Sequence, residues 1–294
     1  MRSLFFLAIS CLLTTSLWGQ KPPQTNVYVF DLKQVTDNKW EFSNPKYLTF
    51  FNKNGYNNQP KFFNNDQLYV TVQFPYEEQP ELYLLNLKDQ TKTRITDTRE
   101  GEYSPTLMPN KNFFSAVRVE ADANKTQRLW EFPVNRRNNG KPVFKYITGI
   151  GYHHWLNNNE VALFMLGEPN YLALADTRTD KTRRIDEKVG RAFQTLPNGS
   201  LAYVRKTDDY NWYITEYNTY RKQSKQIIQT LPGAEDFIVL NDGSILMGKG
   251  SKIFKYHPSY DKNWIEVVDL RYYNINNISR MAISADNKIA IVGN

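Results

Sequence analysis

The chain has 294 residues, of which 23% are charged and 14% aromatic, and its formal net charge is +7. This composition excludes a disordered chain, and the length is sufficient for one large repeat-built domain or two ordinary ones. Because the basic residues are dispersed among acids, the charge indicates a solvated surface, and we do not expect nucleic acid to be a partner.

The N-terminus reads MRSLFFLAISCLLTTSLWGQK. Arg2 precedes a mostly apolar run, Leu4 to Leu17, that is too short to span a membrane comfortably. Small Gly19 follows. We therefore predict a signal peptide over residues 1–19, cut before Gln20, and an exported protein, periplasmic or secreted, with no membrane span after cleavage.

The only cysteine, Cys11, lies inside this segment. One alternative is a lipoprotein anchored through Cys11, with LAIS as its lipobox, but the apolar region before the cysteine would be very short. Residues 20–294 contain no cysteine, so a domain there must be stabilised by its core rather than by disulfides.

A polar turn between two apolar runs occurs six times along the chain. LPNGSLAYV (196–204) returns as LNDGSILMG (240–248), and similar turns surround Asn65, Asn110, Asn158 and Asp286. Successive turns are separated by 45, 48, 40, 44 and 44 residues. Self-similarity at this period indicates a propeller or a solenoid.

Each complete repeat contains four short runs rich in β-branched and aromatic residues, which we interpret as strands. In chain order the runs are 59–63, 67–72, 81–87 and 93–96; 104–108, 113–117, 128–134 and 143–147; 153–156, 161–165, 171–177 and 182–186; 192–196, 200–204, 212–218 and 225–231; 236–240, 244–248, 252–258 and 264–270. We find no convincing amphipathic helix between them.

The sixth repeat supplies only two runs, 280–284 and 288–293, before the sequence ends. Two unassigned runs, 26–32 and 46–50, lie at the other end of residues 20–294. We predict that they complete the last blade and close the ring, because an open stack would leave a long unpaired strand edge. The expected fold is all-β: a six-bladed propeller of four-stranded antiparallel blades over residues 20–294.

The repeats resemble those of the TolB-like six-bladed propellers, a family with a WD-like repeat. SPTLMPNKNFFSAV, LPNGSLAYV and ISADNKIAIV are similar to the first half of the family repeat, and ELYLLNLKDQTKTRITDTREGEYSPTL is similar to its second half. Asp-Gly stands at one turn only, Asp242-Gly243. The resemblance implies an envelope protein that binds a partner, chiefly another protein. TolB itself carries an α/β domain before its propeller, and we expect this chain to lack it.

Loops that connect one blade to the next should lie around the channel mouth, together with the loops between second and third strands. Five of the six blade connections contain a glycine: Gly55, Gly101, Gly151, Gly190 and Gly233. The residues just after them are our candidate ligand-binding rim: Tyr56, Asn58, Glu102, Tyr103, His153, His154, Arg191, Asp236 and Arg280. The second set of loops adds Tyr76, Glu77, Glu78, Asp208, Asp209 and Tyr210. Aromatics beside amides and charges suit the recognition of a peptide or a glycan.

Catalytic signals are weak. GSILMGKG (243–250) matches the first seven positions of a P-loop, but Gly250 stands where Ser or Thr is required. No Gly-x-Ser-x-Gly elbow occurs, and three histidines leave few candidate bases for a triad. Because His153 and His154 are adjacent, they should point to opposite faces of a strand and so are unsuited to binding one metal.

We therefore expect a binding or scaffolding propeller of the cell envelope without catalysis or cofactor. One alternative is a calcium-dependent lactonase or phosphoesterase, with Asn58, Glu102 and Asp236 as oxygen ligands of a channel metal. Another is a glycan-binding propeller.

Overall fold

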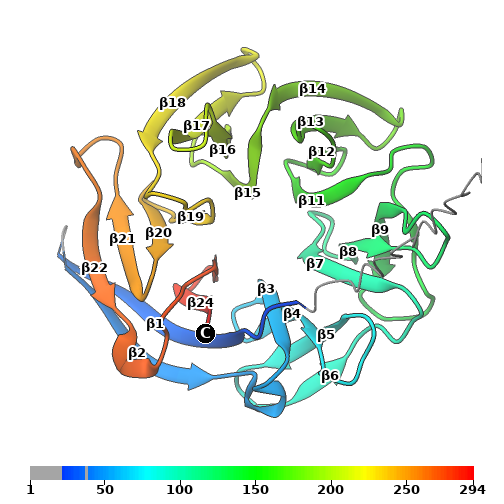
Figure 1. Ribbon diagram of the computed structural model, residues 1–294, viewed down its shortest axis with the longest axis horizontal. Coiled ribbons are helices and arrows are strands. Elements are labelled where there is room, and N and C mark those ends of the chain that lie inside the picture. The colour runs from blue at the N-terminus through cyan, green and yellow to red at the C-terminus, as the bar shows by residue number, and fades with distance from the viewer. Residues whose placement is uncertain (1–21, 37–38) are drawn as a thin grey trace, which may run out of the picture.

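The computed structural model describes residues 22–36 and 39–294. It shows six four-stranded antiparallel sheets arranged in a ring (Figure 1). The predicted six-bladed all-β propeller is confirmed. The predicted signal peptide over residues 1–19, with Cys11 and the cleavage position before Gln20, lies outside the described residues.

Five blades are built from consecutive strands. Blade 1 contains β3 (Tyr56–Asn64), β4 (Gln67–Gln73), β5 (Glu81–Asn86) and β6 (Lys92–Arg94); blade 2 contains β7 (Gly101–Leu107), β8 (Phe113–Val119), β9 (Gln127–Pro133) and β10 (Lys141–Pro142); blade 3 contains β11 (Ile150–Trp155), β12 (Glu160–Met165), β13 (Tyr171–Asp176) and β14 (Lys181–Glu187); blade 4 contains β15 (Val189–Thr195), β16 (Leu201–Lys206), β17 (Trp212–Asn218) and β18 (Gln223–Gln229); blade 5 contains β19 (Phe237–Val239), β20 (Ile245–Lys249), β21 (Lys252–Tyr256) and β22 (Ile265–Asp269).

Blade 6 joins the two ends of the described chain, as predicted. Its strand order is β2-β1-β24-β23, with β23 (Arg280–Ile283) and β24 (Lys288–Gly293) inside and β1 (Asn26–Thr36) and β2 (Lys39–Tyr47) outside. β1 and β24 pair antiparallel, from Asn26 opposite Gly293 to Asp31 opposite Lys288. This pairing closes the ring and covers the strand edge that an open stack would expose.

The core consists of six apolar clusters, and each one lies between two consecutive blades. The cluster at the closing seam packs Val27 and Val29 of β1 against Leu68 and Val70 of β4. Second strands are covered on both faces, so β4 is buried from Leu68 to Val72 without alternation. Outer strands such as β14 and β18 are mostly exposed.

The recurring turn has the same geometry at both copies of the quoted phrase. Ser200 N–H donates to the Asn198 Oδ1 atom at 3.0 Å, and Ser244 N–H donates to the Asp242 Oδ1 atom at 2.9 Å. Gly199 and Gly243 have φ angles of 80° and 91°, a conformation that glycine adopts without steric cost. The repeat therefore encodes a hairpin turn between first and second strands.

Two predicted outer strands are wrong. The run 46–50 is not a strand: β2 ends at Tyr47, and a turn leads into the 3-10 helix η1 (Phe50–Asn52). The run 143–147 is also irregular, because Phe144 and Ile147 both turn inward to the cluster between blades 2 and 3. Residues three apart cannot share one face of a strand, so only Lys141–Pro142 pair as β10.

Within residues 22–36 and 39–294 the helical segments are η1 and a second 3-10 helix, η2 (Arg271–Tyr273). None of the described helices has the length and apolar character needed to cross a membrane. We call the face with the connections between blades, and between second and third strands, the mouth face. The opposite face, which carries the hairpin turns at Asn198 and Asp242, is the turn face.

Candidate functional site

A cavity of about 200 Å³ lies in the central channel, lined by the inner strand of every blade. Its lining includes five residues of the predicted rim: His153, His154, Arg191, Asp236 and Arg280. In blades 1 to 4 the inner strands begin three residues earlier than predicted. Bulges between Asn58 and Lys61 and between Tyr103 and Thr106 let the strands continue through the prolines that follow Gln59 and Ser104.

Three predicted rim residues meet at the mouth of this channel. The Arg191 Nη2 atom lies 2.6 Å from the Asp236 Oδ2 atom, and the Arg280 Nη1 atom lies 3.3 Å from Asp236 Oδ1. Glu235 extends the cluster, since its carboxylate is 3.5 Å from Arg191 Nε and 2.7 Å from Lys206 Nζ. This ion-pair network joins blades 4, 5 and 6.

Arg280 also reaches across the ring. Its Nη2 atom donates a hydrogen bond of 2.9 Å to the hydroxyl oxygen of Tyr152, and its guanidinium carbon lies 4.9 Å from the Tyr152 ring centroid. Burial raises the pKa of Tyr56 and of Tyr103, with smaller effects from Tyr152 on both. Tyr152 therefore contacts Arg280 at the mouth through both its hydroxyl group and its ring.

Tyr152 was not among the predicted site residues. A signal was present, because Gly55-Tyr56, Gly101-Glu102-Tyr103 and Gly151-Tyr152 place a tyrosine one or two positions after the blade-connecting glycine.

His153 and His154 point apart, as predicted. His153 Nε2 lies 2.7 Å from Ser115 Oγ of blade 2, where Trp155 Nε1–H also donates to Ser115 Oγ at 2.9 Å. His154 Nε2 lies 2.8 Å from Thr195 Oγ1 of blade 4. Burial, followed by the charge of Lys61, lowers the pKa of each histidine to about 3, so both are neutral at pH 7.

Lys61 is the second residue that sequence analysis missed. It lies on β3 and lines the channel cavity. The only signal in the sequence is a lysine that follows a proline in the first inner strand, and this pattern has no chemical specificity.

Glu102 does not belong to the accessible rim. It is fully buried between blades 1 and 2, where its Oε1 atom accepts hydrogen bonds from Arg118 Nε at 2.9 Å and Thr98 Oγ1 at 2.8 Å. Burial, followed by the charge of Glu81, raises the pKa of Glu102 to about 8. Asn58 is also buried, and its Oδ1 atom accepts the Gln59 N–H group.

The three residues of the calcium hypothesis have other partners. Glu102 lies on β7 and Asp236 precedes β19, and these strands belong to blades on opposite sides of the ring (Figure 1). Asp236 is paired with two arginines and Glu102 with one. Within the described ranges, no three His, Cys, Asp or Glu side chains are grouped so that they could hold a metal ion. The calcium site stays a prediction.

The second set of predicted loops places two aromatic side chains in solvent. Tyr76 is 80% exposed and Tyr210 is 88% exposed. Of the predicted acids beside them, Glu77 pairs with Arg94 and Asp208 binds the backbone of its own turn, while Glu78 and Asp209 are exposed. Phe50 in η1 and Tyr272 in η2 are exposed on the same face and were not predicted.

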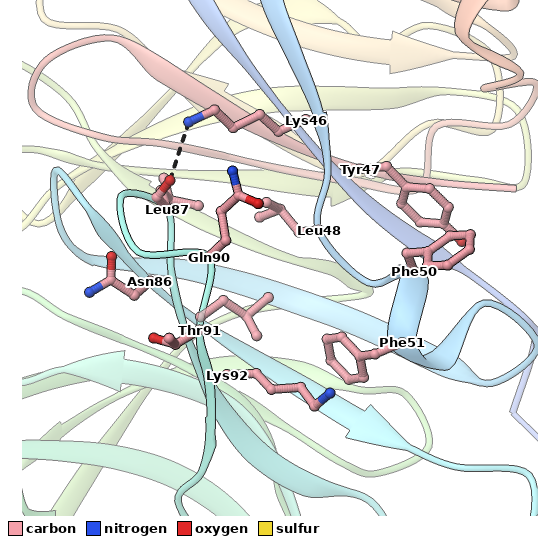
Figure 2. A pocket seen from close by; sticks show the side chains of 11 residues that line it. Lys46, Tyr47, Leu48, Phe50, Phe51, Asn86, Leu87, Gln90, Thr91 and Lys92 are labelled. Carbon is pink, nitrogen blue, oxygen red and sulfur yellow. Dashed lines mark hydrogen bonds between the residues drawn. The ribbon is translucent and has the colours of Figure 1, made fainter.

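A separate groove of about 400 Å³ lies at the seam between blades 6 and 1 (Figure 2). Phe50 and Phe51 of η1 line one side of the groove, and Asn86, Gln90 and Thr91 of blade 1 line the other (Figure 2). Lys46 Nζ donates to the Leu87 carbonyl at 3.2 Å, and Lys92 Nζ lies 4.5 Å from the Phe51 ring centroid.

Comparison with known proteins supports the fold. No protein-family model and no curated protein matches the sequence. A solved structure assigned as TolB from Agrobacterium tumefaciens superposes with a TM-score of 0.67 at 8% identity, covering 92% of this chain and 98% of that one. TolB from Acinetobacter baumannii gives a TM-score of 0.57 at 12% identity, covering 93% of this chain and 65% of that one.

A chain from a nidogen/laminin complex gives a TM-score of 0.64 at 9% identity, covering 88% of this chain and 97% of that one. The described chain is thus a six-bladed β-propeller with the fold of the TolB-like propellers. The resemblance seen in the sequence is confirmed at the level of the fold, and such low identities carry no further function.

Proposed function

We propose that this protein is an exported, non-catalytic propeller that binds a segment of a protein partner on its mouth face. The observation that carries this proposal is the set of solvent-exposed aromatics on that face. Phe50, Tyr76, Tyr210 and Tyr272 are 68%, 80%, 88% and 89% exposed. Large aromatic side chains are enriched in protein interfaces, where their burial supplies much of the binding energy.

The channel mouth supports the same proposal. Arg191, Asp236 and Arg280 hold one another in fixed positions through ion pairs, and Tyr152 orients Arg280. Polar groups that are fixed before binding lose little conformational entropy when a ligand arrives. The chain from the nidogen/laminin complex belongs to a protein–protein assembly, which is in keeping with this use of the fold.

Site-specific photo-cross-linking tests the proposal with matched controls on the two faces. A photoreactive phenylalanine analogue is placed at Tyr76 or Tyr210 on the mouth face, or at Tyr220 or Tyr260, which are 92% and 82% exposed in hairpin turns of the turn face. We expect one protein to be cross-linked in the cell envelope from the mouth face only, and to be lost when Arg280→Ala is added. Equal cross-linking from both faces, or none, would contradict the proposal.

Glycan binding is a second candidate, favoured by the seam groove in Figure 2. An exposed ring at Phe50 can stack on a sugar, while the side chains of Gln90 and Thr91 can hydrogen-bond to hydroxyl groups. Glycan-array binding of the wild type and of Phe50→Ala tests this candidate. Binding that survives Phe50→Ala would remove the groove as the glycan site.

A further inference from the structure

The channel cavity carries an excess of positive charge. Its lining includes three cationic side chains, Lys61, Arg191 and Arg280, and one carboxylate, Asp236. Both arginines contact Asp236, at 2.6 Å and 3.3 Å. The backbone of Lys61 pairs with Tyr69 in the sheet, but its side chain forms no hydrogen bond or ion pair with another residue in the described part of the chain. Asp236, the one carboxylate in the lining, is therefore already paired with the two arginines.

The groups around Lys61 do not supply an opposite charge for its amine. Burial lowers the pKa of the Lys61 amine, and the charge of Lys61 lowers the pKa of His153 and His154. A charged group that is partly removed from water is unfavourable unless an opposite charge or hydrogen-bond acceptors compensate it. An anion beside Lys61 would supply that compensation.

Neutral hydrogen-bond donors line the same cavity. Ser104, Thr106, Gln194 and Gln59 contribute to its wall. The Oε1 atom of Gln59 already accepts from Thr71 Oγ1 at 2.9 Å and from Ser104 N–H at 2.8 Å. The Gln59 side chain is therefore oriented so that its NH₂ group can donate a hydrogen bond to a ligand.

We propose that the channel beside Lys61 binds a carboxylate, presented by the protein segment that the mouth face captures. This inference rests on the proposed function and names the chemistry that the bound segment must offer. A cavity of about 200 Å³ admits one side chain or one chain end rather than a folded element. The carboxylate is an acidic side chain or a C-terminus, and a free small carboxylate would satisfy the same chemistry.

Protection of Lys61 from reductive methylation, followed by peptide mass spectrometry, tests the proposal on the wild-type protein. The probes are Ac-Gly-Glu-Gly-NH₂ for a side-chain carboxylate, Ac-Gly-Gly-Gly with a free C-terminus, and glutarate for a free carboxylate. Ac-Gly-Gln-Gly-NH₂ is the neutral control. At tenfold excess over Kd a carboxylate probe should slow Lys61 methylation about tenfold, because only the free fraction reacts.

Lys225, exposed on the outer strand β18, is the internal control and should react at an unchanged rate. In calorimetric titrations, Lys61→Met should abolish binding of the protective probe, and Lys61→Arg and Lys225→Met should retain it. The proposal is overturned if no carboxylate probe protects Lys61, if the neutral peptide protects equally, or if inorganic phosphate alone protects.

The outcomes also separate this inference from the proposed function. Mouth-face cross-links without protection of Lys61 by any carboxylate would overturn the inference and leave protein binding in place. Protection by glutarate alone, without mouth-face cross-links, would support the carboxylate site and contradict capture of a protein segment.

Discussion

Arg280 of blade 6 and Tyr152 of blade 3 are joined across the channel by a hydrogen bond of 2.9 Å, although 128 residues separate them in sequence. Asp236 holds the same guanidinium from blade 5. Side chains from opposite sides of the ring thus meet at the mouth, and the channel is crossed there by a bonded pair.

Tyr152→Phe should lower the free energy of unfolding by about 1 kcal/mol, because it removes one partly buried hydrogen bond. Asp236→Asn should lower it more, by up to about 3 kcal/mol, because two partly buried arginines then lose their shared carboxylate. Urea unfolding monitored by tryptophan fluorescence measures both effects. An Asp236→Asn effect no larger than that of Tyr152→Phe would show that the ion-pair network contributes little.

Glu102→Gln should change the pH dependence of stability. The pKa of Glu102 is raised to about 8 from its ordinary value of 4.5, so the folded state holds a proton that the unfolded state releases between these values. The stability contributed by this proton is complete below about pH 4.5 and is lost as the pH rises to about 8. Glutamine resembles the protonated acid at every pH.

The variant should therefore gain stability relative to the wild type as the pH rises across this window, by several kcal/mol in total. Urea unfolding of both proteins at several pH values measures the difference directly and cancels the opposing effect of His153 and His154, which are neutral in the folded state. A difference that is constant with pH would show that Glu102 is ionised throughout.

Gly248→Ala should destabilise the fold by about 1–3 kcal/mol through overpacking. A Cβ atom at Gly248 would lie 2.4 Å from the Ile278 Cγ2 atom. Gly248, one of the three glycines in the P-loop-like stretch 243–250, therefore allows close packing between blades 5 and 6. Ile278→Ala provides the matched partner, and the double variant should be more stable than the sum of the two single effects predicts. Strict additivity in thermal unfolding would contradict this contact.

Calcium should leave the melting temperature of the protein unchanged, and EDTA should also have no effect. Asp236 is occupied by arginines and Glu102 is buried beside Arg118, so neither carboxylate is free to bind a cation. A folded-state ligand at a hundredfold excess over Kd adds about 2.7 kcal/mol to stability. A clear increase with calcium would therefore restore the channel-metal hypothesis and the hydrolase activity attached to it.

The repeat was readable from sequence because a hairpin turn places strict local demands on its residues. Asn198-Gly199 and Asp242-Gly243 supply side-chain acceptors and a positive φ within four residues, so the period of the turns shows directly in the chain. Ring closure could also be predicted from the sequence, since the last repeat contained only two strand-like runs and two further runs, 26–32 and 46–50, were unassigned. Outer strands were harder to predict. Phe144 and Ile147 have strand-forming side chains, but both pack into the core between blades 2 and 3.

The candidate site was predicted only in part. Arg191, Asp236 and Arg280 do converge, whereas Glu102 is withdrawn into the gap between two blades, and Tyr152 and Lys61 were overlooked. A one-dimensional pattern places residues in a loop or at a strand end. It does not state which of them face a channel or which face a neighbouring blade.

By itself, the sequence determined the six-bladed all-β ring and the pairing of its two ends, because turn chemistry and apolar periodicity act over a few residues. Only the tertiary structure decided which charges are neutralised. Asp236 is shared by two arginines, and Lys61 is left facing the channel, because the blades bring together side chains from across the whole chain. Electrostatic partners depend on those distances through space, and the order of residues does not specify them.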